Sequence, residues 1–317
     1  MKKVTYVLFL VLSLILLSSC SKSKNADIVT TMFPQYDFAR QIVGDKMSVS
    51  LLLPPGVEVH SYEASSKDMV AIKNAKLFIY TSLEIDTWIK DPNTIGGKDT
   101  VVMNLSEHYE LIEHDHIHPL SLTLETDEHD HEHDDELHYW VDPLVALDLL
   151  DAILEEIVKL DPMNESFYRS NAEVYHEEIH EAHEAFDAFI QEGFVGSKIF
   201  FAGHNAMGLF GTRYHIDIES LFESFKPDAD LTSSELVSFT SIVLESHVSY
   251  LFIEELAEPK AALQIKEELS NDGYTLELLE LHAYHNITKK EMEEGVSYVD
   301  LFLRNTMNIK QALEYQL

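Results

Sequence analysis

Residues 198–214 read KIFFAGHNAMGLFGTRY: an apolar run at 198–202 passes through Gly203 and His204 into a helical pattern at 206–214. A short apolar run followed directly by an amphipathic segment is typical of a strand and helix in a parallel α/β sheet. The residue just beyond such a strand faces the crevice in which α/β folds bind ligands. This stretch therefore predicts an α/β fold and makes His204 a candidate binding residue.

The same alternation occurs on both sides of this stretch. Strand patterns occur at residues 28–32, 48–53, 76–80, 100–105, 198–202, 250–254 and 275–281. Helical patterns occur at residues 36–43, 66–74, 206–214, 234–246 and 259–269, and twice between 289 and 314. Strands alternating with helices predict parallel sheets covered by helices on both faces. Because the units form two sets, we expect two α/β lobes.

Between the two sets, residues 143–192 contain no strand pattern, and Asp161-Pro162 divides them into two helices. The second helix, at 165–191, would be about 40 Å long at roughly 1.5 Å per residue. It predicts a rigid strut between the lobes, and hence small movements of one lobe against the other. The expected division is an N-terminal lobe at 26–160, a linker helix at 161–193 and a C-terminal lobe at 194–317.

The composition excludes several classes of protein. The chain has 317 residues, 22 Lys and Arg against 56 Asp and Glu, and a formal net charge of −34. Such acidity argues against a nucleic-acid partner, since a phosphate backbone is met by clustered basic residues. A hydrophobic content of 45% is too high for a disordered acidic chain. The single cysteine excludes an intramolecular disulfide framework.

The N-terminus has the pattern of a secretory signal. Lys2 and Lys3 precede an apolar run at residues 7–17, which is too short for an ordinary transmembrane span. The sequence Leu17-Ser18-Ser19-Cys20 resembles the lipobox of bacterial lipoproteins. We therefore expect a signal peptide at 1–19, acylation of Cys20 and a polar tether at 20–25. A lipid-anchored protein on the extracytoplasmic face of the membrane follows.

A segment at residues 107–137 is rich in both histidine and acidic residues. Neutral imidazole is a good ligand for zinc and similar metals, and nearby carboxylates attract cations. The segment is interpreted as an auxiliary metal-capturing loop, with a solvated low-complexity insert as the alternative. Its candidate ligands are His114, His116, His118, His129, His131 and His133.

Four other histidines stand in ordered contexts. His204 and His282 directly follow predicted strands, His60 follows a turn after a third, and His138 begins an apolar stretch. A single such histidine is more often structural than a metal ligand. Four of them at strand ends and loops favour a metal site between the lobes.

At these positions the chain resembles the zinc- and manganese-binding solute-binding lipoproteins of bacterial ABC importers. The matching strings are MFPQYDFA at 32–39, PPGVEVH at 54–60, HYWVDP at 138–143 and GHNAMGLF at 203–210. The resemblance implies two α/β lobes joined by a long helix, with the metal held between them. It also implies a permease and an ATPase as partners, and we expect a monomer.

The resemblance implies His60, His138 and His204 as ligands, the third being His in zinc members and a carboxylate in manganese members. Imidazole-rich four-coordinate sites suit zinc, whereas oxygen-rich sites suit manganese, the alternative cargo. The fourth ligand departs from the family pattern, since residues 279–286 read LELHAYHN. Its position favours His282, with Glu280 and His285 as alternatives.

A competing hypothesis is a zinc protease. His176-Glu177-Glu178-Ile179-His180 fits the His-Glu-x-x-His pattern, in which two histidines one turn apart hold zinc and the glutamate activates water. The extended form of the motif fails, because His183 stands where a glycine is required. The charged neighbourhood favours a solvated helix face, so no enzymatic activity is expected. An adhesin is a third class, which would bind a matrix protein without metal.

Overall fold

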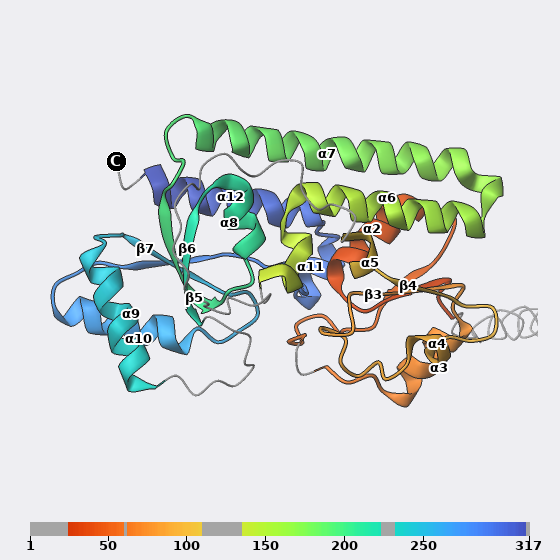
Figure 1. Cartoon of the computed structure of the whole chain (residues 1–317), viewed down its shortest axis with the longest axis horizontal. Helices are drawn as coiled ribbons and strands as arrows, with labels where there is room; N and C mark the ends of the chain where they lie inside the picture. The colour runs from red at the N-terminus through yellow and green to blue at the C-terminus, as the bar shows by residue number, and fades with distance from the viewer. Residues whose placement is uncertain (1–24, 60–61, 110–134, 223–231, 315–317) are drawn as a thin grey trace, which may run out of the picture.

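The computed structural model describes residues 25–59, 62–109, 135–222 and 232–314. Two four-stranded parallel sheets lie side by side beneath the long helix α7 (Glu165–Gln191), as Figure 1 shows. The first sheet has the order β2-β1-β3-β4, and the second has the order β6-β5-β7-β8. This architecture confirms the predicted fold class of two parallel-sheet α/β lobes.

The strands of the first sheet are β1 (Ile28–Thr30), β2 (Val49–Leu51), β3 (Leu77–Tyr80) and β4 (Val101–Asn104). Those of the second are β5 (Lys198–His204), β6 (Asp217–Phe222), β7 (Tyr250–Ile253) and β8 (Glu277–Glu280). Only β6 has no counterpart in the sequence prediction. It is a partly exposed edge strand with Asp217 and Glu219 along it, so it lacks the apolar run that marks its neighbours.

The helices of the first lobe are α2 (Phe33–Val43), α3 (Ser66–Asn74), α4 (Pro92–Ile95) and α5 (Ser106–Tyr109). The 3-10 helix η3 (Asp135–Val141), α6 (Pro143–Leu160), the 3-10 helix η4 (Pro162–Asn164) and α7 (Glu165–Gln191) follow. The second lobe adds α8 (Gly208–Tyr214), α9 (Ser233–Glu245), α10 (Lys260–Asn271), α11 (Lys289–Glu294) and α12 (Tyr298–Glu314). Within the described ranges, no helix combines the length and the apolar character that crossing a bilayer requires.

The helix α7 extends along both lobes (Figure 1). Its buried positions recur every three or four residues, which places them on one face of the helix. They are Tyr168, Ala172, Tyr175, Ile179, Ala182, Phe186 and Ile190. This face belongs to a core cluster that includes residues from both sheets. The lobes therefore share one apolar core along the strut instead of being joined by a free linker.

A buried carboxylate joins three of these helices. Asp37 of α2 accepts hydrogen bonds from the Tyr175 hydroxyl of α7, from the Tyr298 backbone N–H of α12 (2.8 Å) and from Arg40 Nε (2.7 Å). Arg40 Nη2 also donates to the Val296 carbonyl at 2.8 Å. Because α2 belongs to the first lobe and α12 to the second, this network holds the two lobes in one arrangement.

Candidate metal centre

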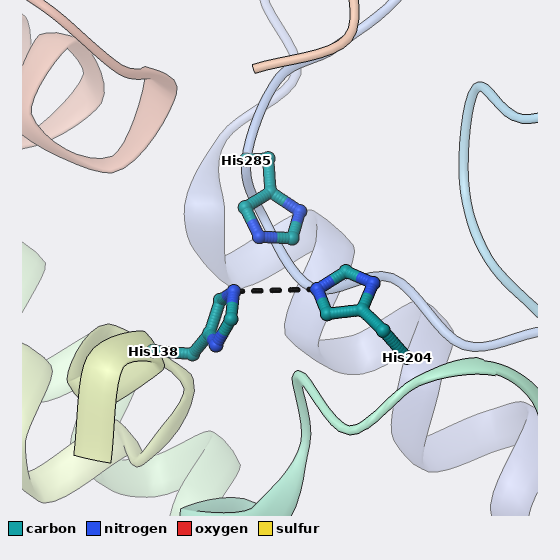
Figure 2. Close-up of side chains that lie close together, drawn as sticks. All are labelled: His138, His204 and His285. Atoms are coloured by element: carbon teal, nitrogen blue, oxygen red, sulfur yellow. Dashed lines mark hydrogen bonds between the residues drawn. The ribbon is translucent and has the colours of Figure 1, made fainter. Parts of the chain in front are cut away.

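Three histidine side chains converge between the lobes: His138, His204 and His285 (Figure 2). The Nε2 atoms of His138 and His204 lie 3.4 Å apart. The ring centroid of His285 lies 5.0 Å from that of His138 and 5.8 Å from that of His204. Two nitrogens bound to one tetrahedral zinc at about 2.0–2.1 Å are themselves about 3.4 Å apart. The spacing of the first two rings therefore fits a shared zinc ion.

His138 belongs to η3, and the two residues after His138 hold this helix in place through hydrogen bonds. The Tyr139 hydroxyl donates to the Thr81 carbonyl, and Trp140 Nε1 donates to the Ala283 carbonyl, each at 2.8 Å. Burial, reinforced by the two neighbouring imidazoles, lowers the pKa of His138 well below its ordinary value of 6.5. The ring is therefore neutral at physiological pH, the form that binds a metal.

His204 lies at the end of β5, as the sequence pattern predicts. Gly203 allows the backbone to lie close to the Phe201 ring, because a Cβ at this position would lie 2.8 Å from that ring. The Nδ1 atom of His204 lies 2.9 Å from Glu254 Oε1. With Nδ1 on the carboxylate, Nε2 is the nitrogen that faces His138 (Figure 2).

His285 lies in the loop after β8, where Tyr284 adopts a positive φ of 64°. Its Nδ1 lies 3.0 Å from Glu255 Oε1, and Glu255 Oε2 accepts a hydrogen bond from the Ala283 N–H at 3.0 Å. Burial lowers the pKa of His285, but the hydrogen bond and charge of Glu255 outweigh it, so the pKa is raised above 6.5. For Glu255, burial raises the pKa, but the two adjacent histidines and the Ala283 N–H hold it below the ordinary value.

His282 and Glu280 do not join the cluster, so the structure brings together the alternative, His285, and not the favoured His282. His282 Nδ1 accepts a hydrogen bond from the Tyr284 N–H at 2.8 Å, which turns the ring back onto its own loop. Glu280 lies 3.2 Å from Arg304 Nη1. The physical reason is that β8 ends at Glu280 and the left-handed turn at Tyr284 carries the next side chain, His285, to His138 and His204.

The loop that precedes His60 is tied to the His285 segment. Asn286 is fully buried, and its side-chain Nδ2 donates to the carbonyls of Pro54 (2.7 Å) and Val57 (2.8 Å). The Gly56 N–H donates to the Ile287 carbonyl at 2.8 Å. Hydrogen bonds therefore join the loop before His60, in the first lobe, to the residues that follow His285, in the second lobe.

Several predicted residues lie outside the described ranges. They are His60, the lipidation residue Cys20, and the auxiliary-loop residues His114, His116, His118, His129, His131 and His133. Their predicted roles rest on the sequence.

The His-Glu-x-x-His motif lies on the partly exposed face of α7. The rings of His176 and His180 stack with centroids 6.4 Å apart, and His183 Nδ1 lies 2.8 Å from the Tyr214 hydroxyl. Among the described residues, no group of three metal-ligating atoms within 4.8 Å includes any of these histidines. Within the part of the chain that the structure describes, the motif therefore has no third ligand at hand.

Glu254 and Glu255 complete the surroundings of the site. They directly follow the carboxyl end of β7, where residues of a parallel sheet face a bound ligand, and this is also the signal that indicates His204. No other feature of the local sequence distinguishes them from the remaining acidic residues. Together with His285 they form a second group of potential ligands within 4.8 Å. Among the described residues, the two groups together contain three imidazoles and two carboxylates.

The family model described as "Zinc-uptake complex component A periplasmic" matches residues 28–312. The chain is 28% identical to the high-affinity zinc uptake system protein ZnuA of Bacillus subtilis, over 93% of this chain and 90% of that protein. It is 26% identical to the zinc-binding lipoprotein AdcA of Streptococcus pneumoniae, and the match spans 62% of that protein's length. The metal-dependent lipoprotein YcdH of Bacillus subtilis superposes with a TM-score of 0.70 at 26% identity, over 90% of this chain and 98% of that one.

Proposed function

Because the chain belongs to the zinc-uptake complex component A family, we propose that it is an extracytoplasmic receptor that captures Zn²⁺ and delivers it to an ABC importer. The observation that carries the proposal is the convergence of three buried imidazoles from both lobes. A receptor must bind its metal tightly and still release it to the transporter, and ligands from two lobes allow this through a small movement of one lobe against the other.

The proposed ligands are His138, His204 and His285, with His60 as the fourth through its resemblance to the family's first ligand. His285 replaces His282 because only its ring lies beside the other two. Four imidazoles suit zinc better than manganese, which prefers oxygen ligands. A zinc ion held by four protein ligands has no open position for a reacting water, which agrees with transport and not with catalysis.

The proposed partners are an ABC permease and its ATPase. The lipobox supports attachment to the membrane through Cys20, and the Streptococcus pneumoniae relative AdcA is named a lipoprotein. A monomeric receptor on the outer face of the cell membrane would pass its metal directly to the permease.

The auxiliary loop provides the first test. We expect the chain without residues 1–19 to bind one Zn²⁺ tightly and further ions weakly in isothermal titration. Deletion of residues 110–136 should abolish the weak sites and leave the tight one, because the tight ligands lie elsewhere. A chain without any tight zinc site would refute the receptor proposal, and loss of the tight site on deletion would refute the auxiliary role of the loop.

Zinc affinity is expected to fall as the pH falls, because a protonated imidazole cannot bind a metal. Between these two ligands, His285, whose pKa is raised, takes up a proton at a higher pH than His138, whose pKa is lowered. Affinity should therefore decrease by at least about tenfold per pH unit as the pH falls below the pKa of His285. Competition titration against a chelator at a series of pH values measures this profile. An affinity that stays constant down to about pH 5 would contradict it.

A further inference from the structure

Two consecutive carboxylates after β7 each contact a different imidazole of the cluster. Glu254 Oε1 lies 2.9 Å from His204 Nδ1, and Glu255 Oε1 lies 3.0 Å from His285 Nδ1. Both contacts use the same ring nitrogen, Nδ1. One short segment of chain thus orients two histidines, one at the end of β5 and the other in the loop after β8.

These contacts determine which nitrogen of each ring can bind a metal. A carboxylate only accepts hydrogen bonds, so Nδ1 of each ring must carry the proton. Nε2 then carries no proton and can offer its lone pair to a cation, and the negative charge on the Nδ1 side makes Nε2 a stronger ligand. In His204, Nε2 is the atom 3.4 Å from His138 Nε2, so the chemically available nitrogen is also the one in the right place.

Resting on the proposed zinc function, we propose that Glu254 and Glu255 are positioning residues that fix His204 and His285 for zinc and supply the charge that the imidazoles lack. Four neutral imidazoles around Zn²⁺ leave a net charge of about +2 in a buried site. Two adjacent carboxylates offset it without occupying a coordination position. This accounts for strong metal binding by a site built from neutral ligands.

Glu255 also determines which of the two nearby histidines faces the metal. Its Oε1 lies 3.7 Å from His282 Nδ1, but that nitrogen accepts the Tyr284 N–H and therefore carries no proton to donate. His285 Nδ1, at 3.0 Å, is the remaining donor. Glu255 thus holds His285 in the cleft, while His282 stabilises the loop.

The two carboxylates differ in burial, and we therefore expect their replacement to lower zinc affinity by different amounts. The Glu255 side chain is 3% exposed and also accepts the Ala283 N–H, whereas the Glu254 side chain is 21% exposed. Water can reach the partly exposed position 254 and accept the hydrogen bond that the carboxylate accepted, whereas it cannot do so at the buried position 255. Loss of an outer partner of a metal-bound histidine lowers metal affinity by roughly 10–100-fold. We expect Glu255→Gln near the upper end of this range and Glu254→Gln near the lower end.

The test compares zinc affinities of the wild type, Glu254→Gln, Glu255→Gln and a control, Glu258→Gln, by competition with a chromophoric chelator. Glu258 lies on the same segment, but its side chain is 75% exposed and pairs only with Lys260 in the described structure. We expect the control to bind zinc as the wild type does. Thermal unfolding of the metal-free variants shows whether a loss of affinity merely reflects a loss of fold. If Glu255→Gln fails to fold, the partly exposed Glu254→Gln carries the test alone.

The visible absorption of bound Co²⁺ supplies a readout that a purely structural role would leave unchanged. We expect its bands to shift in the Glu254→Gln and Glu255→Gln variants and to stay unchanged in Glu258→Gln, because only the first two alter the donor strength of the ligands. Wild-type zinc affinity with unchanged Co²⁺ bands in the folded site variants would overturn the inference while leaving the receptor proposal intact. A wild-type chain without a tight zinc site would instead overturn the receptor proposal.

Discussion

Replacing His285 by asparagine is expected to lower zinc affinity by about 100-fold or more, whereas the same replacement at His282 should change it by less than about fivefold. Loss of an outer partner already costs roughly 10–100-fold, so loss of a ligand should cost at least the upper end of that range. At position 282, an asparagine side chain can accept the N–H two residues later, as His282 Nδ1 does from Tyr284. The loop is therefore retained while the imidazole is lost.

Competition titration against the same chelator compares the zinc affinities of the two variants, which carry the same His→Asn substitution at neighbouring positions. The structure predicts that His285→Asn is the defective variant. The opposite order, with His282→Asn losing zinc and His285→Asn retaining it, would contradict the proposed ligand set and restore the interpretation favoured by sequence position.

The second large effect is expected for stability. Asp37→Ala should lower the free energy of unfolding by about 3–5 kcal/mol, because the fully buried carboxylate accepts three hydrogen bonds and pairs with the partly exposed Arg40. The substitution leaves the Tyr175 hydroxyl, the Tyr298 N–H and Arg40 without their shared acceptor at the junction of α2, α7 and α12. Urea unfolding of the metal-free chain measures the change without a contribution from bound zinc.

Asp45→Ala is the matched control, because the Asp45 side chain is 83% exposed and contacts Lys46 at the surface. This variant should unfold within about 0.5 kcal/mol of the wild type. If Asp37→Ala lost less than about 1 kcal/mol, the buried network would not be what holds the lobes in one arrangement.

Much of the fold could be predicted from sequence because its strands are short apolar runs that alternate with helical patterns. Residues 198–204 illustrate this: burial on both sides of a parallel sheet demands an apolar pattern, and the pattern gives both β5 and the position of His204. The edge strand β6 could not be predicted in the same way. One side of an edge strand faces water, so its alternation of Asp217 and Glu219 with apolar residues is a weak signal.

The limits of prediction at the metal centre have a different cause. His138 and His204 could be predicted because each follows or begins an ordered element. The choice between His282 and His285 depends on Glu255, which lies about 30 residues away in sequence, and on a left-handed turn at Tyr284. Neither the long-range contact nor a positive φ at a non-glycine residue leaves a local pattern. Sequence alone therefore predicts one ligand within residues 279–286 but cannot choose between His282 and His285.

The central claim is that one zinc ion is held between the lobes by His138, His204 and His285, with His60 as the fourth ligand. Its most direct test is an anomalous-difference map at the zinc absorption edge, from crystals of protein purified without chelator. We predict one strong peak about 2.0–2.1 Å from the Nε2 atoms of these histidines. A peak bound instead by His282, or by His176 and His180 on α7, with none between His138 and His204, would contradict the account.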